Sequence, residues 1–203
     1  MLATLLSSAL SCTSEKTGQW HKYIKQAMED FGITTKESKA MFLAQLAYES
    51  DFFTRNEESF NFTVKALKQN FSRNLSRYQC EMLGRNNEHE AQQKAIANLI
   101  YYKFNGNVSI DDGWKYKGRG FLPIRGKYSY LACGNCLNLD LIDHPDLLRE
   151  PAHSVYSAAW LWKEKECNAY PHDVIRITHA LTGGVYGLTD REEMYLRTLE
   201  MMA

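Results

Sequence analysis

The segment AQLAYESDFFTRNEES, residues 44–59, ends an apolar stretch with carboxylates at positions 49, 51, 57 and 58. From Met41 to Ala47 every residue except Gln45 is apolar, a pattern that predicts a helix buried on nearly all sides. Glu49 falls at the C-terminal end of this helix, where burial and the helix dipole both favour a protonated carboxyl group. A general acid that works near neutral pH requires that form.

Glu58 follows nine residues later, outside the predicted helix and among the polar residues Asn56, Glu57 and Ser59. We expect it to stay ionised, and two carboxyl groups in contrasting environments can act as an acid and a base. The same pattern also fits a solvated acidic surface. A metal site is a weaker alternative, since no histidine lies between positions 21 and 89.

A second stretch, DDGWKYKGRGFLPIRG at 111–126, alternates Trp114 and Tyr116 with lysines before a Gly-Arg-Gly break. The alternation predicts a short β-hairpin. Aromatic rings between cations suit stacking on sugar rings, and they also suit single-stranded nucleic acid. Alternatively, Trp114 and Tyr116 are core residues on one face of the strand. Equal numbers of Lys+Arg and Asp+Glu, 24 each, disfavour nucleic acid as the partner.

The elements that must position these residues are mainly helical. Apolar periodicity predicts helices over 19–33, 38–50, 88–104, 151–166, 172–181 and 190–202, in a chain of 203 residues that can bury a full core. Thr34 with Glu37, and Thr189 with Glu192, have capping-box spacing. The opening residues 1–12 have no Lys or Arg before their apolar stretch, so we interpret them as a first helix and not as an export signal.

Five cysteines form an odd count that suits a reducing compartment. Cys133 and Cys136 have CxxC spacing, but no second CxxC or nearby His pair completes a zinc site. We predict two free thiols in a turn there.

Four motifs occur in order: AMEDFGITTKESKAMFLAQLAYES, QKAIANLIYYKFNGN, DGWKYKGRG and TGGVYGLTDR. Together, from about Trp20 to Arg191, they resemble glycoside hydrolase family 19, and within it the phage endolysins and chitinase-like enzymes of Gram-negative systems. The resemblance implies a mainly α, single-domain lysozyme-like fold over residues 1–203, with a small β-hairpin and no separate wall-binding module.

The family pattern Ala-His-Glu-Ser, followed by a segment like Gly-Gly-Phe-Thr-Arg-x-x-Glu-Asn, reads AYESDFFTRNEES here. The resemblance therefore implies that Glu49 is the catalytic acid and Glu58 the catalytic base of an inverting hydrolase. Glu49 would protonate the leaving oxygen while Glu58 activates water on the opposite face, with the carboxyl groups roughly 6.5–9.5 Å apart. The implied substrate-binding residues are Asn61, Trp114, Tyr116, Arg119, Arg125 and Arg191.

Peptidoglycan is the expected substrate, cleaved between N-acetylmuramic acid and N-acetylglucosamine, because the chain looks like a compact endolysin without the larger loops of plant chitinases. No metal, cofactor, nucleic acid or stable membrane anchor is implied, and the protein is expected to be a monomer. We expect synthesis in the cytoplasm of a bacterial host and action on the cell wall in the periplasm after release, through a holin-type pore or another machine.

Several positions depart from the family pattern. Pro123 replaces a Gln, Arg125 a hydroxyl residue that helps to hold the attacking water, Ser129 and Thr182 each an Asn, and Tyr48 a His. Loss of such groups can cost orders of magnitude in rate without changing the fold. The alternative hypothesis is therefore a catalytically weak or inactive relative that binds glycan or a protein partner. If Arg125 points into the cleft, we expect it close to Glu58.

Overall fold

The computed structural model describes residues 8, 10 and 14–202 and is mainly helical. Its α-helices are α2 (Ser14–Asp30), α3 (Lys36–Glu49), α4 (Val64–Asn70), α5 (Arg77–Leu83), α6 (Gln93–Ile100), α7 (Asp112–Lys115), α8 (Lys127–Leu137), α9 (Pro151–Glu164), α10 (Val174–Thr182) and α11 (Leu188–Met201). Two short 3-10 helices, η2 (Pro145–Arg149) and η3 (Cys167–Ala169), flank α9. The mainly helical prediction is confirmed, and residues 1–12, expected as a first helix, lie almost wholly outside the described residues.

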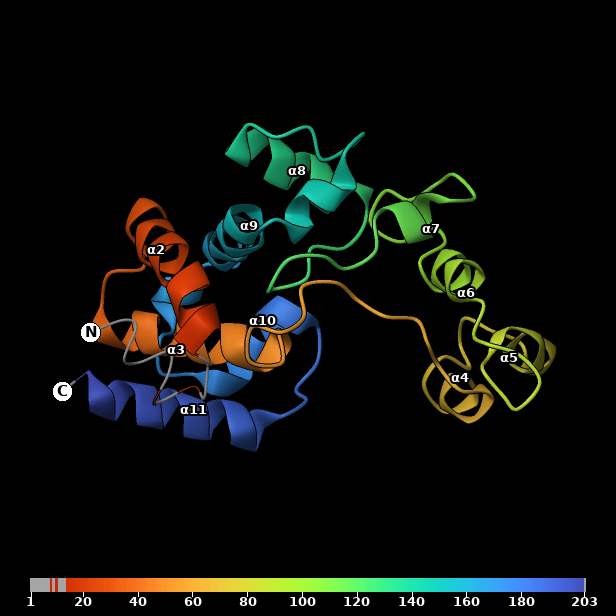
Figure 1. The fold of residues 1–203 in the computed structure, drawn as a ribbon, viewed down its shortest axis with the longest axis horizontal. Coiled ribbons are helices and arrows are strands. Elements are labelled where there is room, and N and C mark those ends of the chain that lie inside the picture. The colour runs from red at the N-terminus through yellow and green to blue at the C-terminus, as the bar shows by residue number, and fades with distance from the viewer. Residues whose placement is uncertain (1–7, 9, 11–13, 203) are drawn as a thin grey trace.

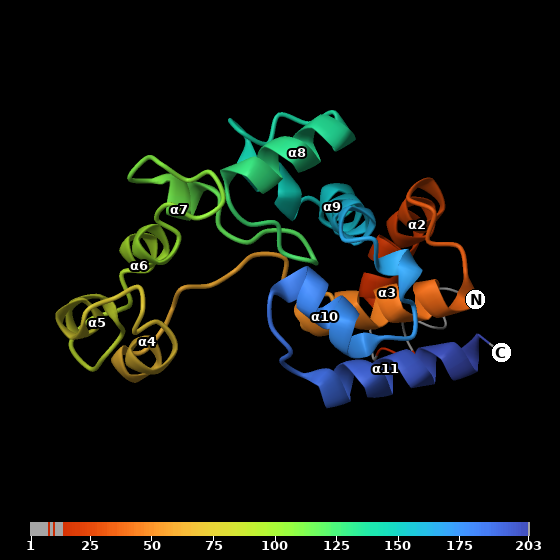
Figure 2. The same cartoon turned by 180° about the vertical axis from the view of Figure 1, so that it is seen from behind.

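The helices form two groups (Figure 1). The large lobe gathers α2, α3, α9, α10 and α11, with α8 above them, and the small lobe holds α4, α5 and α6 at the opposite end of the molecule, a separation that the view from behind also shows (Figure 2). Each lobe has its own cluster of buried apolar residues. The prediction that residues 1–203 form one catalytic domain stays a prediction.

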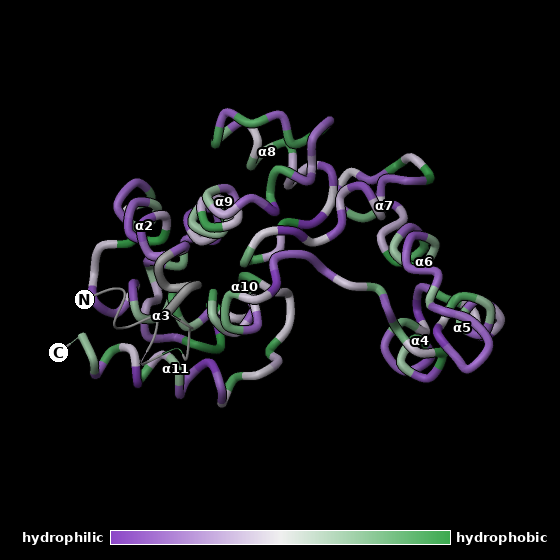
Figure 3. The backbone as a smooth tube through the Cα atoms, in the orientation of Figure 1, coloured by the Kyte–Doolittle hydropathy of each residue, from purple (hydrophilic) through white to green (hydrophobic). Residues whose placement is uncertain are grey.

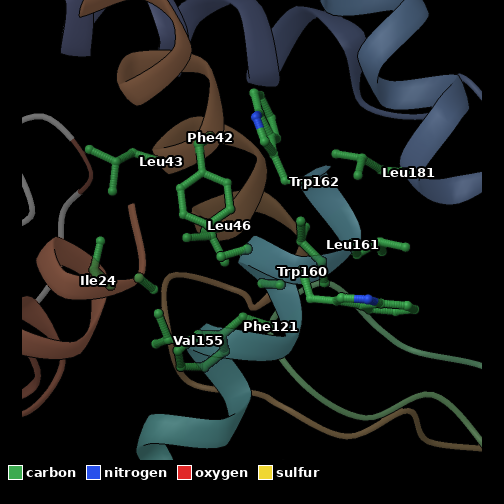
Figure 4. Packing of buried hydrophobic residues seen from close by; sticks show 14 of the residues in the cluster. Ile24, Phe42, Leu43, Leu46, Phe121, Val155, Trp160, Leu161, Trp162 and Leu181 are labelled. Atoms are coloured by element: carbon green, nitrogen blue, oxygen red, sulfur yellow. The ribbon is translucent and has the colours of Figure 1, made fainter. Parts of the chain in front are cut away.

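Helix α3 runs through the core of the large lobe. Ser38 and all residues from 40 to 47 are buried, so the expectation of a helix apolar on nearly all sides is confirmed. Figure 4 shows Phe42 and Leu46 of this helix packed near Trp162 of α9, and the rings of Phe42 and Trp162 meet edge to face with centroids 5.3 Å apart. Burial of such side chains fixes the C-terminal end of α3 within the lobe.

The two predicted N-caps are wrong, the first by one residue and the second by two. Thr35, not Thr34, caps α3 by accepting a hydrogen bond from the Ser38 N–H at 3.1 Å. Helix α11 begins at Leu188, one residue before Thr189, and Gly187 is its N-cap without a side-chain bond. Pro151 does occupy the first turn of α9, where its missing N–H costs nothing.

The predicted hairpin is formed only in part. Asp112–Lys115 is a helical turn, α7, and no β-strand is assigned among the described residues. The chain does reverse between Arg119 and Ile124, whose backbones exchange hydrogen bonds of 3.3 and 2.9 Å, and Arg119 also bridges to Glu57. The CxxC pair lies on helix α8 instead of in a turn, with both thiols free as predicted.

Candidate functional site

Glu49 is the last residue of α3 and is held there by the large lobe. Arg191 of α11 forms an ion pair with its carboxylate and a hydrogen bond with the side chain of Gln45, one turn earlier on α3. The Arg191 guanidinium is only 2% exposed and also donates to the carbonyl oxygen of Tyr186 at 3.1 Å. This contact pairs the Glu49 carboxylate with a buried cation, an interaction that the sequence did not predict.

The chain leaves α3 through a left-handed turn. Asp51, Phe52 and Phe53 have φ values of 50°, 53° and 62°, a conformation that side chains with a Cβ rarely adopt. Ser50 stabilises the turn, because its hydroxyl donates to Leu46 O at 2.6 Å and accepts from Phe53 N at 2.8 Å. Residues 54–59 then cross toward the small lobe as a segment that is largely hydrophilic (Figure 3). The turn thus carries the chain from Glu49 to Glu58.

Glu58 lies on this crossing segment and is held by groups from three other places in the chain. The Tyr101 hydroxyl lies 2.9 Å from both carboxylate oxygens. The Oε2 atom also accepts from the Gly118 N–H at 3.0 Å and from the Arg125 Nε at 3.4 Å. Oε1 has no hydrogen bond except that from Tyr101 among the described residues, so it is the oxygen left for a water molecule.

Arg125 lies where the sequence predicted it, beside Glu58. Burial would lower the pKa of its guanidinium, but the charges of Glu58, Tyr101 and Glu49 outweigh this and raise the pKa above the ordinary value. The charges of both candidate carboxylates, Glu49 and Glu58, therefore act on the Arg125 guanidinium, which stays charged.

Tyr101 is the site residue that sequence reasoning missed. It follows the end of α6 and packs edge to face on Phe60, with ring centroids 5.8 Å apart. Burial, followed by the negative charge of Glu58, raises the pKa of its phenol well above the ordinary value, so the hydroxyl remains a donor. Its only sequence signal was its place in the motif QKAIANLIYYKFNGN, which does not distinguish it from Tyr102.

Two of the expected sugar-binding residues are structural, which corrects the prediction. Tyr116 is 1% exposed in the core of the large lobe, and its hydroxyl donates to Ile142 O at 3.2 Å. Arg119 is 4% exposed and donates to Lys115 O and to the Tyr130 hydroxyl. Neither side chain can present a face to a ligand.

The other expected residues vary in access. Trp114 is half-buried against the small-lobe cluster, and Lys117 Nζ covers one face of its ring at 3.3 Å from the centroid. Asn61 is exposed beside the segment that carries Glu58. Arg191 is buried and forms an ion pair with Glu49, so its side chain holds the Glu49 carboxylate in place.

Glu57, next to Glu58, belongs to a structural network. Its carboxylate pairs with Lys117 at 3.1 Å, Arg119 at 3.3 Å and Arg149 at 3.7 Å, and the first two cations are buried. Burial lowers the pKa of Lys117 despite the opposing effect of Glu57. Adjacent carboxylates therefore have different tasks, since Glu57 holds the loop at 117–119 and Glu58 faces the candidate site.

Two of the polar residues that differ from the family pattern, Ser129 and Thr182, form hydrogen bonds within the protein. The Ser129 hydroxyl accepts from Asn105 Nδ2 at 2.7 Å, and the Thr182 hydroxyl donates to Thr178 O at 2.8 Å at the end of α10. No group of three or more His, Cys, Asp or Glu side chains suited to a metal ion occurs in the described part of the chain. None of the described helices is long and apolar enough to cross a membrane.

Comparison with known proteins matches residues 84–181 to the family model of class I chitinases, a range that begins after both candidate carboxylates. A glycosyl hydrolase family 19 domain-containing protein from Haemophilus influenzae is 34% identical over 177 residues, which cover 86% of this chain and 85% of that protein. Endochitinase 4 of Solanum tuberosum is 40% identical over 73 residues, but these cover only 24% of its length.

Two solved structures share the fold. Chitinase C from Streptomyces griseus HUT6037 matches 98% of this chain and 75% of its own, with a TM-score of 0.59 and 15% identity. A bacterial family 19 chitinase matches 99% of this chain and 94% of its own, with a TM-score of 0.59 and 17% identity. The helical arrangement around α3 is therefore shared even where the sequences have diverged.

Proposed function

The chain belongs to glycoside hydrolase family 19, and from this we propose that it is an endolysin-type enzyme that hydrolyses β-1,4 bonds of peptidoglycan by inversion. The observation that carries the proposal is the contrast between the two carboxylates. Glu49 ends a buried helix on one lobe, and Glu58 lies on the segment between lobes with one oxygen left open. Inverting glycosidases need one acid and one base on opposite sides of the scissile bond.

In the proposed reaction Glu49 protonates the glycosidic oxygen of the leaving sugar. Glu58 Oε1 takes a proton from a water molecule, which attacks the anomeric carbon from the opposite face as the glycosidic bond breaks. Tyr101 and the Gly118 N–H hold the carboxylate, so they act as positioning groups. After the turnover Glu58 carries a proton and Glu49 has lost one, and exchange with solvent restores both.

We propose peptidoglycan in place of chitin as the substrate because the order of the sequence motifs resembles that of a compact endolysin without the larger loops of plant chitinases. The Haemophilus influenzae relative is matched over most of its length, whereas the plant endochitinases are matched over about a quarter of theirs. We propose the bond between N-acetylmuramic acid and N-acetylglucosamine as the target. Action as a monomer in the periplasm, after synthesis in a bacterial host cytoplasm, belongs to the same proposal.

One observation favours a second candidate, a catalytically weakened family member that binds glycan or a protein partner. The Arg125 guanidinium lies 3.4 Å from Glu58 Oε2, at the position where the family pattern has a hydroxyl residue. A fixed cation makes a carboxylate a poorer base. Under this alternative the fold and the glycan-binding surface persist while turnover is slow.

The two candidates separate when purified protein is incubated with isolated Gram-negative sacculi and with chitin oligosaccharides. We expect mass spectra of the soluble fraction to show disaccharide-peptide fragments that end in a reducing N-acetylmuramic acid. Glu58→Gln should release none, while Glu88→Gln, which changes an exposed small-lobe carboxylate, should match the wild type. Glycan binding without fragments would support the weakened relative, and cleavage of chitin alone would refute peptidoglycan as the substrate.

A further inference from the structure

A cavity of about 620 Å³ lies between the turn that follows α3 and the first half of α11. We call it the α3–α11 pocket. Tyr48, Asp51 and Arg55 line it from the α3 side, and Asp190 and Glu193 line it from α11. The pocket is thus bordered on both sides by residues adjacent in sequence to the catalytic candidates, since Tyr48 precedes Glu49 and Asp190 precedes Arg191.

Tyr48 couples the wall of this pocket to the acid. The Arg191 guanidinium, which pairs with Glu49, lies over the Tyr48 ring at 4.0 Å from its centroid. On the other side the backbone of Gly187 packs against the Tyr48 hydroxyl, and a Cβ at position 187 would lie 2.0 Å from that oxygen. The Tyr48 ring therefore packs against the start of α11 and links the wall of the pocket to Arg191, the ion-pair partner of Glu49.

The pocket carries charges of both signs. Asp51, Asp190 and Glu193 supply carboxylates, and Arg55 and Arg197 supply guanidinium groups. All five residues are exposed, and no ion pair among the described residues involves Asp51, Arg55, Asp190 or Glu193. A pocket of this kind can bind a ligand with both amino and carboxylate groups, because each ligand charge meets an opposite charge on the wall.

Several residues that differ from the family pattern line this pocket. Where the pattern has His, Gly and Gly, this chain has Tyr48, Asp51 and Phe52, and all three line the cavity. Asp51 and Phe52 keep φ values of 50° and 53°, which glycine would adopt at lower cost. The chain thus carries side chains here at a conformational cost, which is expected if those side chains contact a ligand.

We propose that the α3–α11 pocket binds the peptide attached to N-acetylmuramic acid, and so selects peptide-bearing glycan over glycan without peptide. The inference rests on the proposed function. The sugars of chitin are uncharged at neutral pH and gain nothing from the pocket's charges, whereas the peptide of Gram-negative peptidoglycan carries free carboxylates and a free amino group. Arg55 binds a carboxylate of the peptide, and Asp190 with Glu193 binds its ammonium group.

The test measures binding by calorimetry in the Glu58→Gln protein, which cannot turn the ligand over. The ligands are the N-acetylglucosamine–N-acetylmuramic acid disaccharide with its tetrapeptide and the same disaccharide without peptide. We expect about fivefold to tenfold tighter binding of the peptide-bearing ligand at low salt, and a loss of this preference at high salt.

Adding Arg55→Gln, or Asp190→Asn with Glu193→Gln, should abolish the preference and leave the affinity for the bare disaccharide unchanged. The matched control variants are Arg73→Gln and Glu88→Gln, which remove exposed charges on the small lobe. Both should keep the preference for the peptide-bearing ligand. Because all these side chains are exposed, melting temperatures should stay near that of the parent protein.

Equal affinity for the two ligands, no binding of either, or a preference that survives the pocket substitutions would overturn the inference. The proposed function fails separately, if wild-type protein releases no fragments from sacculi. If the protein prefers the peptide-bearing ligand but cleaves nothing, the inference about the pocket is supported and the proposed hydrolase activity is refuted. If it cleaves sacculi but shows no preference, the hydrolase activity is supported and the inference about the pocket is refuted.

Discussion

Glu49 and Glu58 are held by two regions that are built differently. Glu49 ends a helix whose buried residues, from 40 to 47, fix it in the core, and one guanidinium from α11 completes its setting. Glu58 lies on an extended segment, and its carboxylate is fixed by Tyr101, Gly118 and Arg125, from three separate parts of the chain. Glu49 is thus positioned mainly by a local element and Glu58 by tertiary contacts alone.

The largest expected effect comes from removing either carboxylate. Glu49→Gln and Glu58→Gln should each lower kcat on peptidoglycan by about 100-fold or more, because each removes proton transfer in the transition state. Far-UV circular dichroism and the melting temperature should stay near wild type. A variant that keeps substantial activity would show that its carboxylate is not the acid or base.

Tyr101→Phe tests whether the tertiary contacts of Glu58 position its carboxylate. We expect kcat to fall by about tenfold, because the lost hydroxyl no longer holds both oxygens of the Glu58 carboxylate in position. The acidic limb of the pH–rate profile should also move to higher pH, because the carboxylate loses a hydrogen-bond donor. Tyr102→Phe is the matched control, since Tyr102 is 57% exposed. A lower kcat with an unmoved profile would make Tyr101 structural.

Arg125→Thr, ideally combined with Pro123→Gln, should raise activity on peptidoglycan severalfold. The substitution removes the cation at 3.4 Å from Glu58 Oε2, which makes the carboxylate a stronger base and shifts the acidic limb of the pH–rate profile upward. Initial rates across a pH series are the measurement. A loss of activity comparable to that of Glu58→Gln would instead show that Arg125 takes part in the mechanism.

Glu57→Gln separates structure from chemistry at adjacent residues. In this variant the buried cations of Lys117 and Arg119 would lose a partner. We expect a loss of about 1–2 kcal/mol in the free energy of unfolding, reduced by solvent screening because the Glu57 side chain is 27% exposed. Urea unfolding checks this, with Glu88→Gln as the control that should not change.

Asp51→Gly should give the smallest effect and a favourable one. Glycine adopts the φ of 50° without the clash of a Cβ, so we expect stability to rise by about 1 kcal/mol. In a chain of this size that corresponds to a melting temperature about 2–4 °C higher. Asp51→Ala keeps the Cβ and should gain nothing, and an equal gain from both would refute strain as the cause.

The same contrast explains what the sequence could predict. Helix α3 and the place of Glu49 followed from an apolar run and from motif order, because a buried helix leaves a continuous pattern. The partners of Glu58 did not, since Tyr101 precedes Gly118 by many residues and only the fold brings them together. The predicted exposure of Tyr116 and Arg119 failed for a related reason, because a helical turn forms at Asp112–Lys115 and the fold buries both side chains that follow it.

Short helices escaped prediction for a local reason. Helices α4 and α5 have seven residues each and are held by side-chain caps at Thr63 and Ser76, and seven residues are too few for a clear apolar period. These helices matter for function because they form part of the small lobe, which residues 54–62 connect to the large lobe. The family resemblance supplied the two roles of Glu49 and Glu58, and the contacts show how each carboxylate is held.

The most direct test of the contrast between Glu49 and Glu58 is the anomeric form of the first product, followed by proton NMR during cleavage of a soluble peptidoglycan oligosaccharide. An acid and a separate base that activates water predict that the α-anomer of the new reducing sugar appears first and then equilibrates with the β-anomer. A β-anomer formed first would mean that Glu58, or another group, attacks the sugar itself, and would contradict the assignment of Glu58 as a base.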